Sequence, residues 1–142
     1  MGLSESERRD VVQLRMEKAA NTMEQVRGIV PMQYLEVIAN RLYYAAYYAV
    51  SALIIANGDT AQTHSGVVRA FGLHFVKTGR VSNKLGSLYN KLYVMRLTGD
   101  YDDTHNLEED EVLPFVDPTG ELIEEINKLT IQVLQEKLGK SA

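Results

Sequence analysis

The chain has 142 residues, enough for one domain, and 45% of them are hydrophobic, enough to build a buried core. It contains no cysteine, which excludes disulfide bonds and thiolate metal sites and fits an intracellular, cytoplasmic location. The formal net charge of −4 argues against a dedicated nucleic-acid coat protein. Residues 1–20 are charged throughout, so no secretory signal is visible.

The first two of five predicted helices have clear start and stop signals. Ser4 and Glu7 have the spacing of a capping box, and the first helix is expected to end at Gly28. Pro31 is expected in the first turn of the second helix, because proline lacks the N–H that this turn leaves unbonded. The pair Asn57-Gly58 predicts a left-handed stop to the second helix.

Residues 40–56 of the second helix contain no proline, glycine or acid. Tyrosines four apart stack on one side of a helix, whereas alanines at 45, 46, 49 and 52 form a flat side where another helix can come close. A helix that is apolar almost all round is expected to be central. It is not predicted to span a membrane, because the uncharged run over 42–58 is at the short limit and carries four phenols.

The remaining helices follow the same kind of pattern. The third is expected over 64–78, and the fourth from near Ser82 to a stop at Gly99. A polar loop over 100–106 precedes a fifth helix, whose start at Asn106 would pair with Glu109 in a capping box. Pro114 and the proline at 118 leave two alternatives, a kinked helix or a short helical piece before a main helix over 121–138.

These elements predict an all-α, up-and-down bundle of five helices without strands. The whole chain, residues 1–142, forms one domain with its core over about residues 5–138, and residues 139–142 are expected to fray.

The charges are segregated along the chain. Residues 60–99 hold six bases and no acid, whereas residues 100–125 hold eleven acids and no base. In one interpretation the two blocks lie side by side and neutralise each other. In the other, part of the basic block faces an anionic partner such as RNA or a nucleotide.

No metal or cofactor is predicted. The histidines at 64, 74 and 105 lack the spacing of paired ligands, and His64 has the position of a structural residue at a helix start. Phosphate-loop and dinucleotide-binding glycine motifs are absent from the sequence. The carboxylates at 100, 102 and 103 favour capping of helices over binding of Mg²⁺.

Four segments together carry a resemblance to a known family. They are Asn-Arg-x-Tyr-Tyr-Ala-x-Tyr-Tyr-Ala from Asn40, Thr-His-Ser-Gly-Val from Thr63, Phe-Gly-x-His from Phe71 and Arg-Leu-Thr-Gly-Asp-Tyr from Arg96. In this order and at these spacings the set resembles HEPN domains, over roughly residues 10–138. The resemblance implies the same all-α bundle.

Arg96 is the residue that links this resemblance to chemistry. HEPN ribonucleases use an arginine followed after four to six residues by a histidine, with two copies meeting across a dimer. The arginine stabilises the charged phosphorane and the histidine moves the proton of the ribose 2′-hydroxyl. Arg96 matches, but Tyr101, Asp102 and Asp103 fill the histidine window, and His105 follows only after eight residues. Tyrosine is a poor base near neutral pH, and Arg96 could instead be a helix C-terminal cation paired with Asp100.

Three functions stay open. The first is a HEPN-type binding module, a homodimer of a toxin–antitoxin type that partners a minimal nucleotidyltransferase and/or binds nucleotide or RNA. The second is a metal-independent endoribonuclease with Arg96 and His105 as catalytic residues, and the third is a scaffolding bundle without a small ligand. The predicted binding residues are Arg96, Asp100, Tyr101, Lys91, Lys84, Arg80, Lys77, Asn40, Arg41 and Tyr44.

Overall fold

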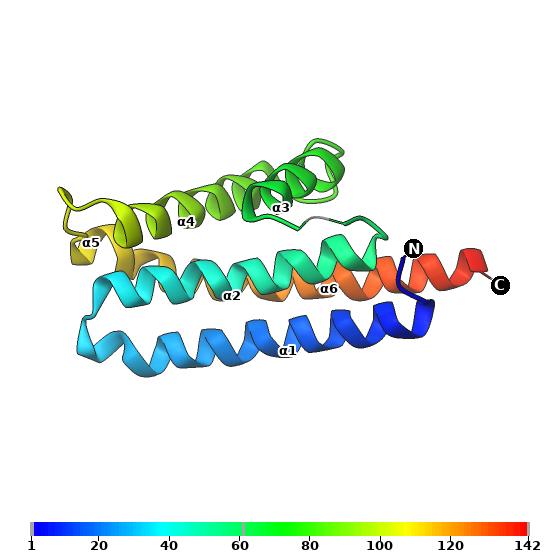
Figure 1. Ribbon diagram of the computed structural model, residues 1–142, viewed down its shortest axis with the longest axis horizontal. Helices are drawn as coiled ribbons and strands as arrows, with labels where there is room; N and C mark the ends of the chain where they lie inside the picture. The colour runs from blue at the N-terminus through cyan, green and yellow to red at the C-terminus, as the bar shows by residue number, and fades with distance from the viewer. Residues whose placement is uncertain (1, 61, 142) are drawn as a thin grey trace.

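The computed structural model describes residues 2–60 and 62–141, with side chains described as far as residue 137. Over this part of the chain the fold is all-α and contains no strand (Figure 1). The helices are α1 (Glu5–Ile29), α2 (Leu35–Ala56), α3 (His64–Phe71), α4 (Asn83–Tyr101), α5 (Glu109–Val112) and α6 (Val116–Ser141), with short 3-10 helices η1 (Val30–Met32) and η3 (Leu113–Phe115) and a π-helical turn η2 (Gly72–Val76).

The second helix is central, as its composition predicted. It runs antiparallel beside α1, with α6 behind it and with α3 and α4 along its other side (Figure 1). Its flat alanine side is completely buried, with Ala45, Ala46, Ala49 and Ala52 all at 0% exposure. Counting α3 with η2, and α5 with η3 and α6, the five expected helical segments form the up-and-down bundle.

Several predicted helix ends are confirmed by hydrogen bonds and backbone angles. Ser4 and Glu7 form the capping box of α1, and the Ser82 side chain accepts a hydrogen bond from Leu85 N at the start of α4. Gly58 and Gly79 have φ angles of 86° and 83°, the left-handed conformation that favours glycine.

The connection between α1 and α2 differs from the prediction. Gly28 does not end the first helix, which continues to Ile29 and then into the 3-10 helix η1. Pro31 lies in η1 rather than in the first turn of α2, since a short 3-10 helix also leaves its first N–H groups unbonded. Gln33, with a φ angle of 57°, turns the chain instead.

Gly99 also does not stop its helix, because α4 continues to Tyr101. A Cβ atom on Gly99 would lie 3.0 Å from Leu107 Cδ1 and 3.7 Å from the Cα of Glu36. The glycine therefore lets the end of α4 approach the start of α2 closely. As a consequence, Asp100 lies on the last turn of α4 rather than in the predicted loop, in reach of α2.

The fifth helical segment is divided. The helix α5 is a single turn, Pro114 lies in η3, and the main helix α6 then runs to Ser141, with Ala142 outside the described residues. The capping box forms between Glu108 and Glu111 rather than between Asn106 and Glu109. Pro114 therefore separates a short helical piece from the main helix, which is one of the two predicted alternatives, whereas Pro118 lies in the first turn of α6, which begins at Val116 rather than at residue 121.

Candidate functional site

Arg96 lies on the inner face of α4 and is only 6% exposed. Its guanidinium carbon is 4.8 Å from the ring centroid of Tyr43 and 5.7 Å from those of Tyr44 and Tyr93. Aromatic rings within about 6 Å attract a cation through their negative faces. The tyrosines of α2 and α4 therefore form the walls around this buried charge.

The polar contacts of Arg96 are incomplete. Its Nη1 lies 3.8 Å from Asp100 Oδ2, too far for a hydrogen bond, and its buried Nε has no hydrogen-bond partner among the described residues. Asp100 instead accepts a hydrogen bond of 3.0 Å from Asn40 Nδ2. Asn40 Oδ1 accepts hydrogen bonds of 3.1 and 2.8 Å from Arg41 Nε and Nη2. The guanidinium is thus a buried and only loosely paired cation.

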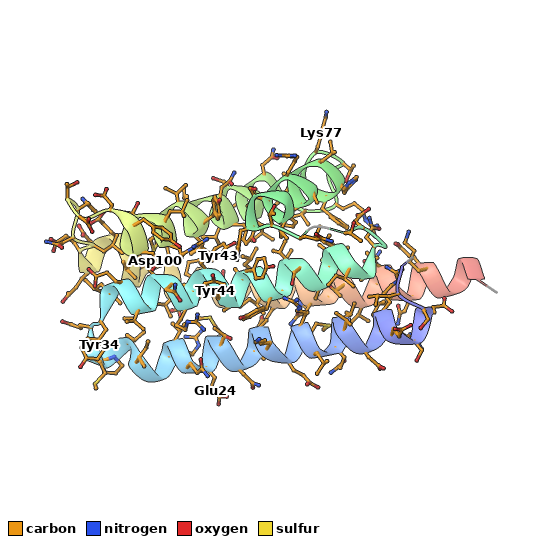
Figure 2. All side chains as sticks on the ribbon, in the orientation of Figure 1. Glu24, Tyr34, Tyr43, Tyr44, Lys77 and Asp100 are labelled. Carbon is orange, nitrogen blue, oxygen red and sulfur yellow. The ribbon has the colours of Figure 1, made fainter. Side chains whose placement is uncertain are left out.

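Five of the predicted binding residues meet at this place. Figure 2 shows Asp100 of α4 beside Tyr43 and Tyr44 of α2. Arg41 of α2 completes the group, with its guanidinium carbon 5.0 Å from the Tyr44 ring centroid. The five are Asn40, Arg41, Tyr44, Arg96 and Asp100, and we call them, with Tyr43, the arginine site.

His64 is the histidine beside this site, which the sequence did not indicate. It begins α3, and its Nδ1 lies 2.6 Å from the Tyr43 hydroxyl oxygen. Its ring centroid is 4.5 Å from that of Tyr47. Burial, and secondly the positive charge of Arg96, hold the pKa of His64 below its usual 6.5. Neutral histidine is therefore favoured near pH 7.

The hydroxyl groups of Tyr43 and of the buried Tyr89 keep their protons at neutral pH. Burial raises the pKa of Tyr43 to about 12, and it raises the pKa of Tyr89 well above 10. A protonated Tyr43 can donate to Nδ1 of His64 in the tautomer that carries its proton on Nε2. Tyr43 thereby connects the imidazole on one side with the guanidinium over its ring on the other.

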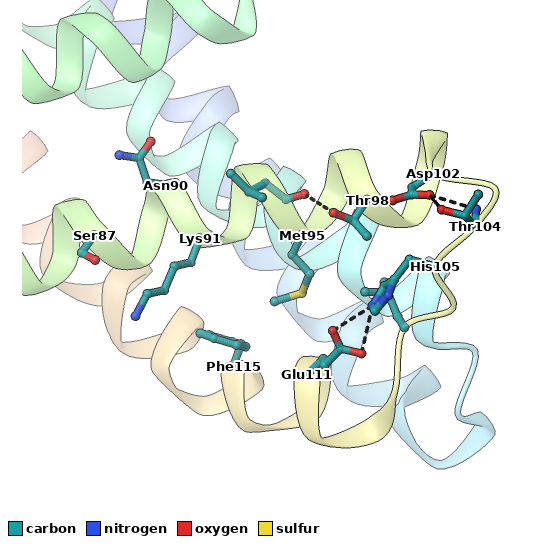
Figure 3. A pocket seen from close by; sticks show the side chains of 12 residues that line it. Ser87, Asn90, Lys91, Met95, Thr98, Asp102, Thr104, His105, Glu111 and Phe115 are labelled. Atoms are coloured by element: carbon teal, nitrogen blue, oxygen red, sulfur yellow. Dashed lines mark hydrogen bonds and ion pairs between the residues drawn. The ribbon is translucent and has the colours of Figure 1, made fainter.

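His105, the predicted catalytic partner of Arg96, lies elsewhere. Its Nε2 is 2.9 Å from Glu111 Oε2, and this contact lowers the pKa of Glu111 (Figure 3). His105 lines an open groove of about 1150 Å³ together with Ser87 and Val94 of α4. Arg96, in contrast, faces the tyrosines of α2. The structure therefore places Arg96 and His105 on different faces of α4, each with its own partners.

The other predicted binding residues are dispersed. Lys84 and Lys91 line a neighbouring cavity of about 440 Å³ opposite Glu121 and Glu124, so the basic and acidic blocks do lie side by side here. Arg80 pairs with a glutamate outside the predicted acidic block, Glu136, at 3.1 Å. Tyr101 is 70% exposed on the last turn of α4, and Lys77 lies at the turn before α4, far from Asp100 at the other end of that helix (Figure 2).

Metal-binding groups and membrane-spanning helices are both absent from the described residues. No group of three or more histidine, cysteine, aspartate or glutamate side chains is arranged there to hold a metal ion. No helix in that part of the chain is both long and apolar enough to cross a membrane.

The comparison with known families decides the classification. The HEPN domain profile matches residues 12–129. The chain belongs to the HEPN domain family. A UPF0332 protein of Thermotoga maritima is 34% identical over 87% of this chain and 94% of its own length. The "Putative toxin MJ0142" of Methanocaldococcus jannaschii is 30% identical over 68% of this chain and 65% of its own length.

A solved structure supports the fold alone. The crystal structure of TT1696 from Thermus thermophilus covers 83% of this HEPN chain and 97% of its own, with a TM-score of 0.69 and 16% identity. The predicted all-α HEPN bundle is therefore confirmed by both profile and architecture.

Proposed function

We propose that this HEPN-type chain is a binding module whose arginine site takes a phosphate of a nucleotide or of RNA. The observation that carries the proposal is the Arg96 guanidinium, which is buried, lacks an acceptor at Nε and lies 3.8 Å from the Asp100 carboxylate. A buried donor without an acceptor destabilises the folded protein. Phosphate oxygens match the planar fork of a guanidinium and would supply these acceptors.

The surroundings of Arg96 support this ligand class. Tyr44 is partly exposed, and the guanidinium of Arg41 lies over its ring. Stacking on aromatic rings next to cationic side chains is how many proteins hold nucleotides without reading their sequence. Asp100 would remain bound to Asn40 when phosphate replaces it beside Arg96.

The test is a substitution that removes the charge and keeps the volume. Arg96→Met should leave the fold intact, because the Asp100 carboxylate that it leaves behind is 27% exposed and keeps its hydrogen bond from Asn40. Isothermal titration with a nucleoside monophosphate should then show affinity reduced at least tenfold. Arg27→Met, at an exposed arginine paired with Asp117, is the matched control and should bind like the wild type. Equal binding by both variants would contradict the proposal.

The proposal extends to partners. The resemblance to HEPN proteins implies a homodimer and a minimal nucleotidyltransferase partner in the cytoplasm, and two relatives carry the printed name of toxins. We expect the chain to act with these partners in a toxin–antitoxin pair. Sedimentation as a strict monomer at tens of micromolar would exclude the homodimer. Absence of a complex with a co-expressed minimal nucleotidyltransferase, chosen from a neighbouring gene, would exclude the second partner.

A second candidate function, metal-independent RNA cleavage, is favoured by one observation. His64, and not His105, lies beside the arginine site, joined to it through the Tyr43 hydroxyl. In the other neutral tautomer, Nδ1–H of His64 donates to the Tyr43 oxygen, and the free Nε2 can then remove a 2′-hydroxyl proton next to a phosphorane stabilised by the guanidinium. With labelled RNA in EDTA, His64→Gln should abolish cleavage and His105→Gln should not. Absence of cleavage would exclude this function, and absence of nucleotide binding as well would favour the scaffolding bundle.

A further inference from the structure

A second group of cations lies over a neighbouring tyrosine of α2. The Lys18 ammonium of α1 is 4.8 Å from the Tyr48 ring centroid, and the guanidinium carbon of Arg15 is 6.0 Å from it. This repeats the arrangement at Tyr44, whose ring carries Arg41 at 5.0 Å and Arg96 at 5.7 Å. Each of the two tyrosines is thus flanked by two cations.

The two arrangements are close enough to act on one ligand. The ring centroids of Tyr44 and Tyr48 are 6.1 Å apart, and Tyr47 lies 6.0 and 5.7 Å from them. All three tyrosines are partly exposed at the surface. Figure 2 labels Tyr44 on α2, the helix that lies between α1 and α4 in this view.

The number of such contacts exceeds the average for a chain of this length. Significant cation–aromatic contacts occur about once per 70 to 80 residues, so roughly two are expected in a chain of this length. Here four cations from three different helices, Arg15, Lys18, Arg41 and Arg96, lie over tyrosines of one helix. Lys18 is exposed, so its position over the ring does not serve the buried core.

We propose that this tyrosine stripe, formed by Tyr44, Tyr47 and Tyr48 with the four cations, binds a single-stranded polynucleotide across at least two consecutive nucleotides. Each nucleotide brings one base and one phosphate, and each end of the stripe offers one partly exposed tyrosine with cations over its ring. A mononucleotide fills only the end at Arg96. The inference rests on the proposed function, because it extends the ligand of the arginine site toward α1.

The experiment compares ligand lengths in two variants of equal charge. Fluorescence anisotropy is measured with labelled single-stranded RNA and DNA of two and eight nucleotides, and titration calorimetry with a nucleoside monophosphate. The test variant is Arg15→Glu with Lys18→Glu. The control is Arg9→Glu with Lys128→Glu, two exposed positions outside the stripe.

The expected result separates the two ends of the stripe. The wild type should bind the octanucleotide roughly tenfold to a hundredfold more tightly than the monophosphate, from one additional stacked base and its phosphate. The test variant should lose this gain, keep its affinity for the monophosphate, and show a salt dependence reduced by about 0.7 in log–log slope for the one lost phosphate contact. Equal affinity for RNA and DNA identifies the shared polynucleotide backbone, and preference for RNA identifies contacts to the 2′-hydroxyl.

Three outcomes would overturn the inference. They are an octanucleotide bound no more tightly than the monophosphate, a test variant that binds like its control, or no binding of any ligand. Only the last also contradicts the proposed function, so the two failures are distinguishable. If the test variant does not give a cooperative thermal transition, Arg15→Gln with Lys18→Gln takes its place with the same expectations.

Discussion

The two sides of α2 have different roles: the alanine side packs against neighbouring helices, and the tyrosine side carries the candidate site. The alanine side has no polar side-chain atoms and no exposure at all, so it lets neighbouring helices approach closely. The tyrosine side keeps hydroxyls at the ring edges and leaves Tyr44, Tyr47 and Tyr48 half-buried under cations. One helix thus holds the bundle together with small side chains and carries the candidate site on large ones. Substitutions on the two sides of α2 should therefore have different effects on the stability of the protein.

The largest effect is expected on the alanine side. Ala46→Arg would place an unpaired charge and a long side chain at a position with 0% exposure. This should lower the free energy of unfolding by about 3 to 5 kcal/mol, measured by urea denaturation. Ala20→Arg, at an exposed position of α1, is the matched control and should change it by less than about 0.5 kcal/mol. A near-normal midpoint for Ala46→Arg would refute the central position of α2.

The alanine and tyrosine sides of α2 could be predicted from the sequence, because they depend on local spacing. Alanines and tyrosines three and four apart fix the two sides of a helix regardless of its neighbours. Glycine was less informative. Gly58 marks a left-handed stop, whereas Gly99 is inside a helix and matters for its contact with Glu36 and Leu107. The same residue type serves both purposes, and only the packed structure distinguishes them.

The candidate site was harder to predict from the sequence, because it too depends on contacts between different helices. Arg96 was selected by its resemblance to a family motif, and Asn40 and Tyr44 by their place in the second helix. His64 was set aside because a search for ligand pairs along one helix cannot detect a contact between residues 21 positions apart. Its position beside Tyr43 follows from the packing of α3 on α2. A histidine at a helix start next to a tyrosine-rich helix was the available signal.

A smaller effect is expected from the hydroxyl of Tyr43. Tyr43→Phe removes the hydrogen bond to His64 and should lower the free energy of unfolding by about 1 kcal/mol at pH 7. The folded pKa of Tyr43, about 12, lies above the usual 10, so its proton is held more tightly in the folded state. The wild type should therefore lose stability as pH rises from 10 to 12, and Tyr43→Phe should lose less.

Urea denaturation at pH 9 and pH 11 measures this difference. Part of the slope should remain in Tyr43→Phe, since burial also raises the pKa of Tyr89. Tyr101→Phe is the control, because Tyr101 is 70% exposed and should leave the slope unchanged. An identical slope in wild type and Tyr43→Phe would show that this hydroxyl ionises as freely as one in water.

The smallest effect distinguishes the two histidines, one in each environment of α4. The folded pKa of His64 lies below 6.5, so the unfolded chain binds the proton more readily. Stability should therefore fall as pH drops below 6.5 toward that folded pKa, and His64→Gln should remove this part of the slope between pH 7.5 and 5.5. His105→Gln should retain this part of the slope.

The pKa of Glu111, the partner of His105, is lowered from 4.5, so stability from that carboxylate is lost only as pH falls below 4.5, outside this window. A slope that disappears in His105→Gln and persists in His64→Gln would reverse the assignment, and would place the pH-sensitive histidine in the open groove instead of beside Arg96.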